Sequence, residues 1–258
     1  MDDSPTGQPE LVLTCDHCGR TVQARSRFCN GCGKAIPRNA PKPFVDDAFL
    51  KRQRNFLIAF AVVLFYILGA HIGDGVERWT GALWWDAGLF ALVVLSGLFF
   101  QDVLGPALRF DGFTWGKLGL YAALQVLLTF GVLVALAAIR SALDLEDASY
   151  MALYADSPAP LLLALLSVAV FPAVSEELAF RGVLFGQLAT LTGAWSTVAV
   201  TGFLFAWVHF SFLSLFWLVP AGLFFGWMRL REGTIWYGVI CHFMHNATVV
   251  LGDANGWW

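Results

Sequence analysis

The stretch Phe171-Pro-Ala-Val-Ser-Glu-Glu-Leu-Ala-Phe-Arg181 places two neighbouring glutamates, Glu176 and Glu177, within one of the most apolar parts of the chain. Ionisable side chains at membrane depth are costly, so they usually serve a function. Glu177 and Arg181 are four residues apart and can pair on one face of a helix. One glutamate is enough for that ion pair, and Glu176 therefore needs another explanation.

The composition of the whole chain predicts an all-α polytopic membrane protein and argues against a soluble domain. Of its 258 residues, 58% are hydrophobic and 14% are charged. The fourth apolar segment, at 159–188, is longer than one span needs, so we expect its helix to tilt, to kink at Pro172 or to extend beyond the bilayer. The apolar segments predict about seven transmembrane helices, at 55–72, 83–100, 118–139, 159–188, 195–211, 213–229 and 234–252.

The distribution of basic residues predicts an integral membrane protein with a cytosolic N-terminus. On that assumption nine Lys and Arg residues face the inside, and two, Arg78 and Arg140, face the outside. Cytoplasmic loops carry such an excess of positive charge. No apolar run precedes Phe56, so we expect no cleavable signal peptide and an uncleaved first helix as anchor. The nine inner residues are Arg38, Lys42, Lys51, Arg52, Arg54, Arg109, Lys117, Arg229 and Arg231.

Four of the five cysteines form two CxxC knuckles in the polar head, Cys15-Asp-His-Cys18 and Cys29-Asn-Gly-Cys32. Gly19 and Gly33 ease the turn of each knuckle, so that the thiolates face one point. Four thiolates predict a closed tetrahedral zinc site that supplies folding energy to a head with almost no core. A disulfide pair, an iron site, or His17 in place of one thiolate are the alternatives at this point.

The chain divides into four predicted parts. Residues 1–36 form the zinc-ribbon domain, 37–54 a linker with proline and basic residues, 55–252 the membrane domain with its motif core at 159–252, and 253–258 a short tail. The head resembles the short zinc ribbons of many bacterial membrane proteins, which implies the bacterial inner membrane. Its four basic residues are also typical of a solvated surface. We therefore expect a protein partner for the head rather than nucleic acid.

The other polar groups of the apolar segments fall at similar depths. With a rise of 1.5 Å per residue, Glu176 lies ~18 Å, His209 ~21 Å and Asn246 ~18 Å from the inner ends of their helices. His242 lies ~12 Å from its inner end, one turn before Asn246 on the same face. These positions predict a single site within the membrane. His245 points about 100° away from Asn246, so we expect it outside the core of that site.

Three motifs resemble those of the type II CAAX prenyl endopeptidases, the CPBP or Abi family of intramembrane proteases. Glu176-Glu177-Leu-Ala-Phe-Arg181 matches the EExxxR motif, Phe205-Ala-Trp-Val-His209 the FxxxH motif, and His242-Phe-Met-His-Asn246 the HxxxN motif. The motifs occur in the family's order, and the resemblance covers about residues 118–252. One motif alone would be weak, whereas three in order are specific.

The resemblance implies a glutamate-dependent endopeptidase that acts inside the membrane without a catalytic cofactor. By carry-over, Glu176 is the general base that activates a water molecule, helped by His209. His242 and Asn246 would stabilise the oxyanion of the tetrahedral intermediate. The expected partners are membrane lipid and a membrane-associated peptide or protein substrate, whose prenylation is left open. The supporting residues would be Glu177, Arg181 and Phe205, the last as a wall behind His209.

Two other interpretations of the same residues remain open. Glu176, His209 and His242 could instead be ligands of a catalytic zinc ion, since two histidines and a carboxylate form such a set. A non-catalytic membrane protein, such as a scaffold, an immunity factor or an ion pathway, could also use these polar groups. The chain contains neither a Gly-x-Ser-x-Gly nor a His-Glu-x-x-His motif. Cys241 is expected to be a small packing residue.

Overall fold

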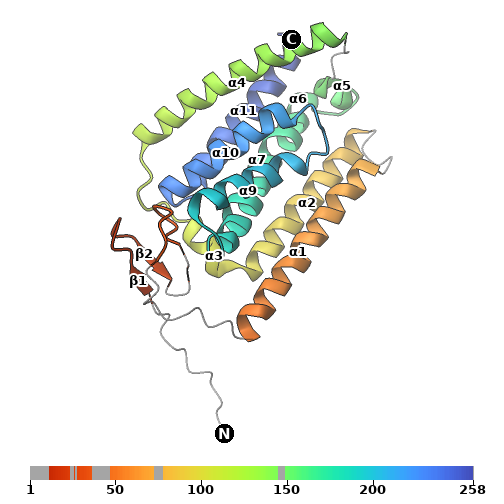
Figure 1. The fold of residues 1–258 in the computed structure, drawn as a ribbon. Coiled ribbons are helices and arrows are strands. Elements are labelled where there is room, and N and C mark those ends of the chain that lie inside the picture. The colour runs from red at the N-terminus through yellow and green to blue at the C-terminus, as the bar shows by residue number, and fades with distance from the viewer. Residues whose placement is uncertain are drawn as a thin grey trace.

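The computed structural model of the protein describes residues 12–23, 26, 28–36, 47–72, 78–144 and 149–257. Most of these residues are helical, and the strands β1 (Val12–Thr14) and β2 (Thr21–Gln23) form an antiparallel hairpin in the head (Figure 1). An all-α fold preceded by a small cysteine-containing head is thus confirmed. The first part of the predicted linker, residues 37–46 with Arg38 and Lys42, lies outside the described residues.

The long helices coincide with the predicted apolar segments. α1 (Asp47–Ile72) begins within the predicted linker, and α11 (Trp236–Ala254) ends within the predicted tail. Between them lie α2 (Trp79–Phe99), α3 (Gln101–Ala107), α4 (Trp115–Leu143), α5 (Tyr150–Tyr154), α9 (Ala194–Trp207) and α10 (Leu215–Glu232). The fourth apolar segment is one composite helix of α6 (Pro160–Ala164), η2 (Leu165–Val170), α7 (Phe171–Glu176), η3 (Glu177–Leu184) and α8 (Phe185–Leu188).

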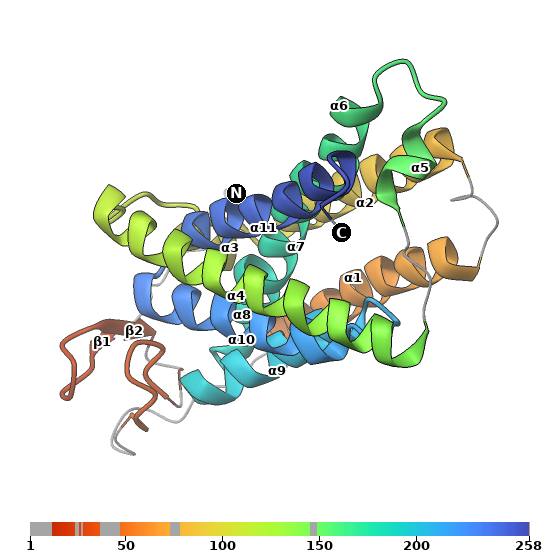
Figure 2. The same ribbon diagram turned by 90° about the horizontal axis from the view of Figure 1, so that it is seen from above.

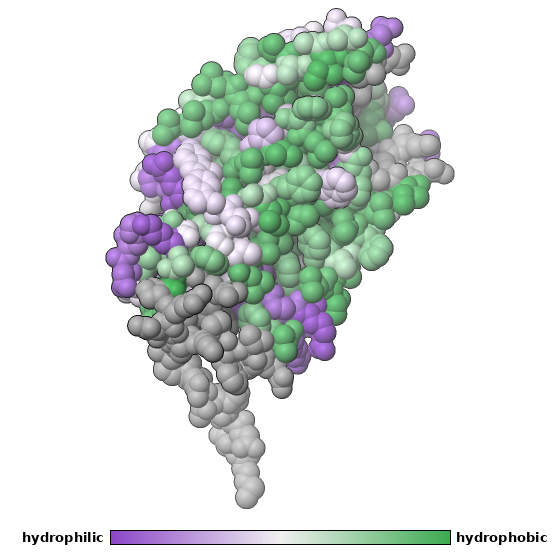
Figure 3. All heavy atoms as spheres, in the orientation of Figure 1, coloured by the Kyte–Doolittle hydropathy of each residue, from purple (hydrophilic) through white to green (hydrophobic). Residues whose placement is uncertain are grey.

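Four helical stretches are long and apolar enough to cross a membrane. They are Phe49–Ala70, Trp79–Phe99, Trp115–Leu143 and Pro160–Leu188. α9 has 14 residues and is shorter than the about 20 that a span needs. Hydrophobic residues cover the helices, whereas hydrophilic ones gather toward the ends of the bundle (Figure 3). The protein is therefore an integral membrane protein with several spans, and seven crossings stay a prediction.

Two π-helical stretches, η2 and η3, interrupt the composite helix on either side of α7. Such wider turns are frequent at functional sites. Pro172 has no N–H to donate to the carbonyl of Val168, four residues earlier, so a regular α-helical hydrogen bond is missing there. The helix continues through Pro172 with π-helical turns, and it carries Glu176 and Glu177 inside the bundle rather than toward lipid.

α9 and α10 pack side by side along their lengths (Figures 1 and 2). The approach is closest at Gly202 and Gly222, where a Cβ atom on Gly202 would lie 2.9 Å from the backbone nitrogen of Leu223. Small residues allow such backbone contact between helices in a membrane, where burial of apolar side chains gives little driving force. The pair fixes the position of the loop that follows α9, which carries His209.

The head lies against the end of the bundle where α9 begins and α10 ends (Figure 1). Phe28 and Gly33 contact the start of α9 around Gly193. The Arg20 side chain donates a hydrogen bond of 3.5 Å to the Leu230 carbonyl near the end of α10. The cysteine-containing head is thus packed on the membrane domain.

Candidate active site and metal centre

A polar cavity of about 1070 Å³ opens inside the bundle, and all four predicted catalytic residues line it. Its walls come from α2, α4, α5, η2, α7, α9, α10, α11 and the loop after α9. The sequence predicted that these side chains, from three separate helices, come together in one site. In the structure they line one cavity. The predicted residues on its surface are Glu176, Phe205, His209, His242 and Asn246.

Glu177 and Arg181 form the predicted ion pair and are both fully buried. Arg181 Nη1 lies 3.0 Å from Glu177 Oε1, and Nη2 donates to the Gly222 carbonyl at 3.1 Å. The guanidinium also lies 4.3 Å from the centre of the Phe205 ring, within the range of a cation–π interaction. Phe205 is therefore more than a wall behind His209, since it also covers the buried arginine.

His242 lies between the two glutamates. Its Nδ1 is 3.3 Å from Glu177 Oε1, and its Nε2 is 3.8 Å from Glu176 Oε2. The Glu177 carboxylate, paired with Arg181, accepts a hydrogen bond from Nδ1–H and fixes which ring edge faces Glu176. The ring of Phe225 stacks on the imidazole with a centroid distance of 5.3 Å. The separation of 3.8 Å is too long for a direct hydrogen bond to Glu176.

Glu176 differs from its neighbour in having no fixed partner. Its side chain is 21% exposed, whereas that of Glu177 is 0% exposed. Within the described part of the chain, one oxygen of each glutamate is buried without a hydrogen-bond partner, Oε2 in both, but only Glu176 borders the cavity. A buried carboxylate oxygen is almost always hydrogen-bonded, so Glu176 Oε2 is the atom at which a water molecule or a substrate group would bind.

His209 follows the end of α9, where the chain turns at Phe210 with a positive φ of 48°. Its Nδ1 donates a hydrogen bond of 2.8 Å to the Phe205 carbonyl, four residues earlier. A carbonyl can only accept, so the neutral ring carries its proton on Nδ1 and has a lone pair on Nε2. The backbone of the FxxxH motif thereby sets the tautomer of its histidine.

Asn246 is tied to the composite helix. Its Nδ2 donates a hydrogen bond of 2.9 Å to the carbonyl of Val168. This is the carbonyl that Pro172 leaves without its α-helical donor, so the amide of α11 satisfies a defect in the neighbouring helix. Asn246 thus holds α11 against η2 and still keeps a second amide hydrogen.

Two groups of cavity residues were not predicted. His245, expected outside the core, lines the same cavity and contacts Thr129 on α4, because the cavity is wide enough to reach that helix. Asp86 on α2 also lines the cavity and accepts a hydrogen bond from Ser167. Asp86 is a charged residue inside an apolar segment, which is the same signal that pointed to Glu176.

A second pocket, of about 70 Å³ and almost wholly apolar, lies on the other side of Glu176. α1, α2 and the composite helix line it, and Glu176 is one of the lining residues, together with Ser175 and Ala179. Glu176 therefore separates a polar cavity from an apolar pocket. Cys241 is fully buried in a cluster with Tyr237 and Phe225, which confirms its packing role.

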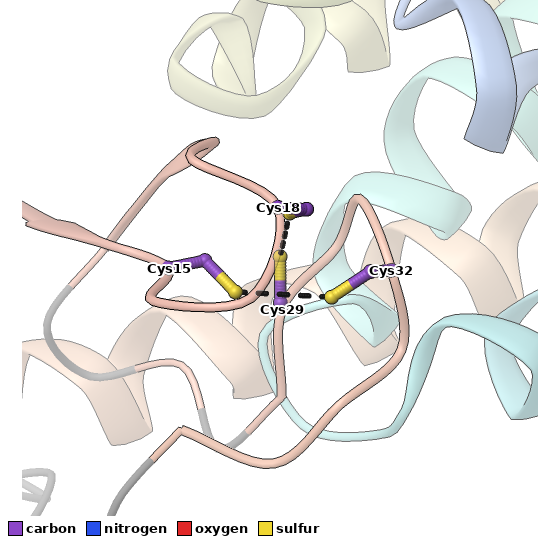
Figure 4. Close-up of side chains that lie close together, drawn as sticks. All are labelled: Cys15, Cys18, Cys29 and Cys32. Atoms are coloured by element: carbon purple, nitrogen blue, oxygen red, sulfur yellow. Dashed lines mark hydrogen bonds between the residues drawn. The ribbon is translucent and has the colours of Figure 1, made fainter.

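The four head cysteines come together as predicted. Their Sγ atoms lie within 4.8 Å of one another, with 3.7 Å between Cys15 and Cys32 and 3.5 Å between Cys18 and Cys29 (Figure 4). Four sulfurs at about 2.3 Å from a tetrahedral zinc ion would be about 3.8 Å apart, so the donor set fits a metal ion. All four are free cysteines rather than disulfides.

The two knuckles have the backbone that sulfur ligands need. Gly19 and Gly33 adopt positive φ angles of 70° and 74°, as expected of glycines that close tight turns. Backbone hydrogen bonds from His17 and Cys18 lower the pKa of the Cys15 thiol to about 7, whereas burial raises the pKa of the Cys29 thiol to about 12. A bound cation would have to displace the proton of the buried thiol.

Comparison with known proteins agrees with the site. No curated protein and no solved structure matches the chain. The family model described as type II CAAX prenyl endopeptidase Rce1-like matches residues 158–248. This range begins just before α6 and ends within α11, so it contains all three motifs and every predicted catalytic residue. Residues 158–248 of this chain are thus similar to the type II CAAX prenyl endopeptidase Rce1-like family.

Proposed function

We propose that the protein is an intramembrane endopeptidase that hydrolyses peptide bonds of membrane-associated peptides or proteins. The observation that carries the proposal is the state of Glu176. Its Oε2 has no hydrogen-bond partner among the described residues, lies 3.8 Å from His242 Nε2, and borders a cavity of about 1070 Å³. A cavity of this volume has room for a short peptide segment, since drug-sized pockets measure about 300–1,000 Å³.

Glu176 acts as the general base in this proposal. It accepts a proton from a water molecule, whose oxygen then attacks the carbonyl carbon of the scissile peptide bond. The lone pair on His209 Nε2 accepts the second hydrogen of that water and orients it, because Nδ1 is already donated to the Phe205 carbonyl. When the C–N bond breaks, the proton held by Glu176 passes to the leaving amine, and the products are a carboxylic acid and an amine.

His242 and Asn246 supply the donors for the oxyanion. With Nδ1–H given to Glu177, His242 donates to the oxyanion from Nε2–H. Asn246 gives one amide hydrogen to Val168 and has the second available. Donors held in place before the reaction stabilise developing negative charge without reorganisation. Glu177 and Arg181 position His242.

The surroundings of Glu176 favour an apolar group next to the scissile bond. The apolar pocket ends at this carboxylate, and α1, which forms its outer wall, presents Phe65 and other apolar side chains to the surroundings. A substrate that enters from lipid would meet the pocket first. We propose that the membrane domain spans residues 55–252, with the head on the cytosolic side.

The head is proposed to be a zinc ribbon. Cys15, Cys18, Cys29 and Cys32 would hold the ion in a closed site, which supplies folding energy and no open coordination position for chemistry. Its contacts with α9 and α10 favour a structural or docking role for the ribbon.

Peptide cleavage in detergent tests the function. A panel of internally quenched peptides, farnesylated CaaX peptides beside unmodified apolar ones, is incubated with the wild type and with Glu176→Gln. We expect cleavage by the wild type and a loss of at least about 100-fold in the variant, because general-base catalysis contributes about that factor or more. Asp102→Asn, which changes a half-exposed carboxylate paired with Arg52, is the matched control and should cleave normally. Equal rates for wild type and Glu176→Gln would disprove the assignment and favour a non-catalytic role.

The alternative of a catalytic zinc ion is separated by metal analysis of the full chain. Among the described residues, the four head cysteines are the one group of three or more side chains gathered closely enough to hold a metal. We therefore expect one equivalent of zinc per chain. Two equivalents, with the second lost in His209→Ala, would favour the metalloprotease.

A further inference from the structure

Only two of the described residues that line the polar cavity carry a buried side-chain atom without a hydrogen-bond partner: Glu176 and Gln125. Glu176 belongs to the proposed reaction. Gln125 lies on α4, outside the three motifs and outside the segment that matches the family model, and its side chain is 1% exposed. An unpaired amide group is costly to bury, so its position on a cavity wall points to a ligand.

Gln125 is one end of a short hydrogen-bonded relay between α4 and α11. Its Nε2 is 3.3 Å from Thr129 Oγ1, one turn along α4. Thr129 Oγ1 is in turn 2.8 Å from Nδ1 of His245 on α11. Among the described residues the other amide atom of Gln125, Oε1, is buried without a hydrogen-bond partner, and Nε2 of His245 is the ring nitrogen that the relay does not use. Both residues line the cavity.

The relay gives its two free ends opposite hydrogen-bonding character. If Gln125 donates to Thr129, the hydroxyl donates to His245 Nδ1, and the neutral imidazole carries its proton on Nε2. The cavity then meets an acceptor at Gln125 Oε1 and a donor at His245. If the Gln125 side-chain amide is flipped, so that its oxygen accepts from Thr129, every hydrogen bond of the relay reverses. Gln125 then offers the donor and His245 the acceptor. In either direction the relay offers one donor and one acceptor.

We propose that Gln125 and His245 form a subsite for the main chain of the substrate, in which one accepts a backbone N–H and the other donates to a backbone C=O. A peptide unit has this pair of groups, whereas a lipid chain has neither. The proposal rests on the proposed function. Gln125 and His245 touch the substrate, and Thr129 is a positioning residue that sets the direction of both.

The subsite lies close to the scissile bond but does not overlap it. Along α11, His245 lies between His242 and Asn246, and it is turned by about 100° from Asn246 and contacts Thr129 on α4. The subsite is therefore displaced sideways from the two oxyanion donors. We expect it to engage a peptide unit next to the one that is cleaved.

An ester scan of the substrate tests the subsite. In the quenched peptide that wild type cleaves fastest, each amide except the scissile one is replaced in turn by an ester, which removes one N–H with little change in shape. We expect one position, adjacent to the scissile bond, at which the ester lowers kcat/KM of the wild type by about three- to tenfold, the value of one net hydrogen bond. Gln125→Met and His245→Leu are measured with the same set, beside Leu127→Met, a lipid-facing control on α4.

Of the two variants, the one that lacks the hydrogen-bond acceptor for the substrate N–H should lose its sensitivity to the ester at that position alone. Its kcat/KM for the all-amide peptide should be about three- to tenfold lower than that of the wild type. Introducing the ester at that position should then lower its kcat/KM by less than a further twofold. Leu127→Met should keep the full wild-type sensitivity. A scan in which both variants respond to every ester as the wild type does would overturn the subsite while leaving the protease proposal standing. Absence of cleavage by the wild type would overturn both proposals. Elution as a monodisperse species separates these outcomes from misfolding. If the acceptor variant misfolds, the wild-type scan still decides, because a scan with no sensitive position next to the scissile bond would overturn the subsite.

Discussion

Replacement of Arg181 by methionine leaves the Glu177 carboxylate inside the bundle without its cation. Both side chains are fully buried, and the pair is 3.0 Å apart. Breaking such a pair by removing one partner costs about 3–5 kcal/mol, mainly because a charge is left unpaired. The variant also loses the hydrogen bond to the Gly222 carbonyl and the contact with the Phe205 ring. Since these losses overlap, we expect a total of about 4 kcal/mol, a large share of the about 5–15 kcal/mol of a typical fold.

The double variant Glu177→Gln with Arg181→Met isolates the electrostatic part. Removing both charges is far less costly than removing one, so the double variant should recover about 2–3 kcal/mol relative to Arg181→Met alone. The neutral amide introduced by Glu177→Gln cannot hold His242 as an ionised carboxylate does. We therefore expect stability to return while peptide cleavage stays low, which distinguishes support of the fold from positioning of His242.

Unfolding in mixed detergent micelles with increasing dodecyl sulfate measures these free energies, and the 11 tryptophans of the chain provide the signal. Arg109→Met, at an exposed arginine, is the matched control and should lie within about 0.5 kcal/mol of wild type. A cost below about 1 kcal/mol for Arg181→Met, or a coupling below about 0.5 kcal/mol, would refute the view that this ion pair is desolvated and essential.

Three further changes probe other contacts. Gly238→Ala would place a Cβ atom 2.6 Å from Glu177 Oε2, so the carboxylate must shift. We expect cleavage to fall by about tenfold or more. Circular dichroism should show that the fold is retained. Asn246→Leu leaves the Val168 carbonyl without a donor and should lower the free energy of unfolding by about 1–3 kcal/mol in the same micelle titration, besides its effect on rate; unchanged stability would contradict the bridge between α11 and η2. Cys29→Ser removes the most buried of the four thiols and should reduce bound zinc from one equivalent to near zero by elemental analysis, whereas Cys241→Ser should keep the full equivalent.

The sequence was sufficient for the helices and for the motif residues because both depend on local signals. Intramembrane charge identified Glu176 and Glu177, and i,i+4 spacing identified the Glu177–Arg181 pair, which is confirmed. The bounds of α1 were missed because a helix can extend past the apolar segment, through Lys51 and Arg52, on its way out of the membrane. Charged residues tolerate helical geometry, so apolarity alone does not locate a helix end.

His245 shows what spacing alone cannot provide. Its angle from Asn246 on α11 was correct, but the conclusion that it lies outside the site assumed a narrow cavity. The width of the cavity depends on where α4 packs, and no local pattern in the sequence gives that position. The i,i+4 pair of Gln125 and Thr129 in the apolar segment 118–139 was the available signal, because two polar groups on one face of a lipid-facing helix need a partner.

The roles proposed for the two glutamates follow from what their side chains contact. Sequence order does not distinguish them, since both are acidic residues in the same apolar turn. Glu177 Oε1 lies against Arg181 and His242 in a region with no exposed surface, so its charge is committed to holding other groups. Glu176 Oε2 has no such partner among the described residues and borders both the polar cavity and the apolar pocket. A base must meet a water molecule during turnover, and the Glu177 side chain has no exposed surface at which it could do so. The division of labour is therefore set by η3, which directs Glu177 into the protein core while Glu176, at the end of α7, faces the space where a substrate could enter.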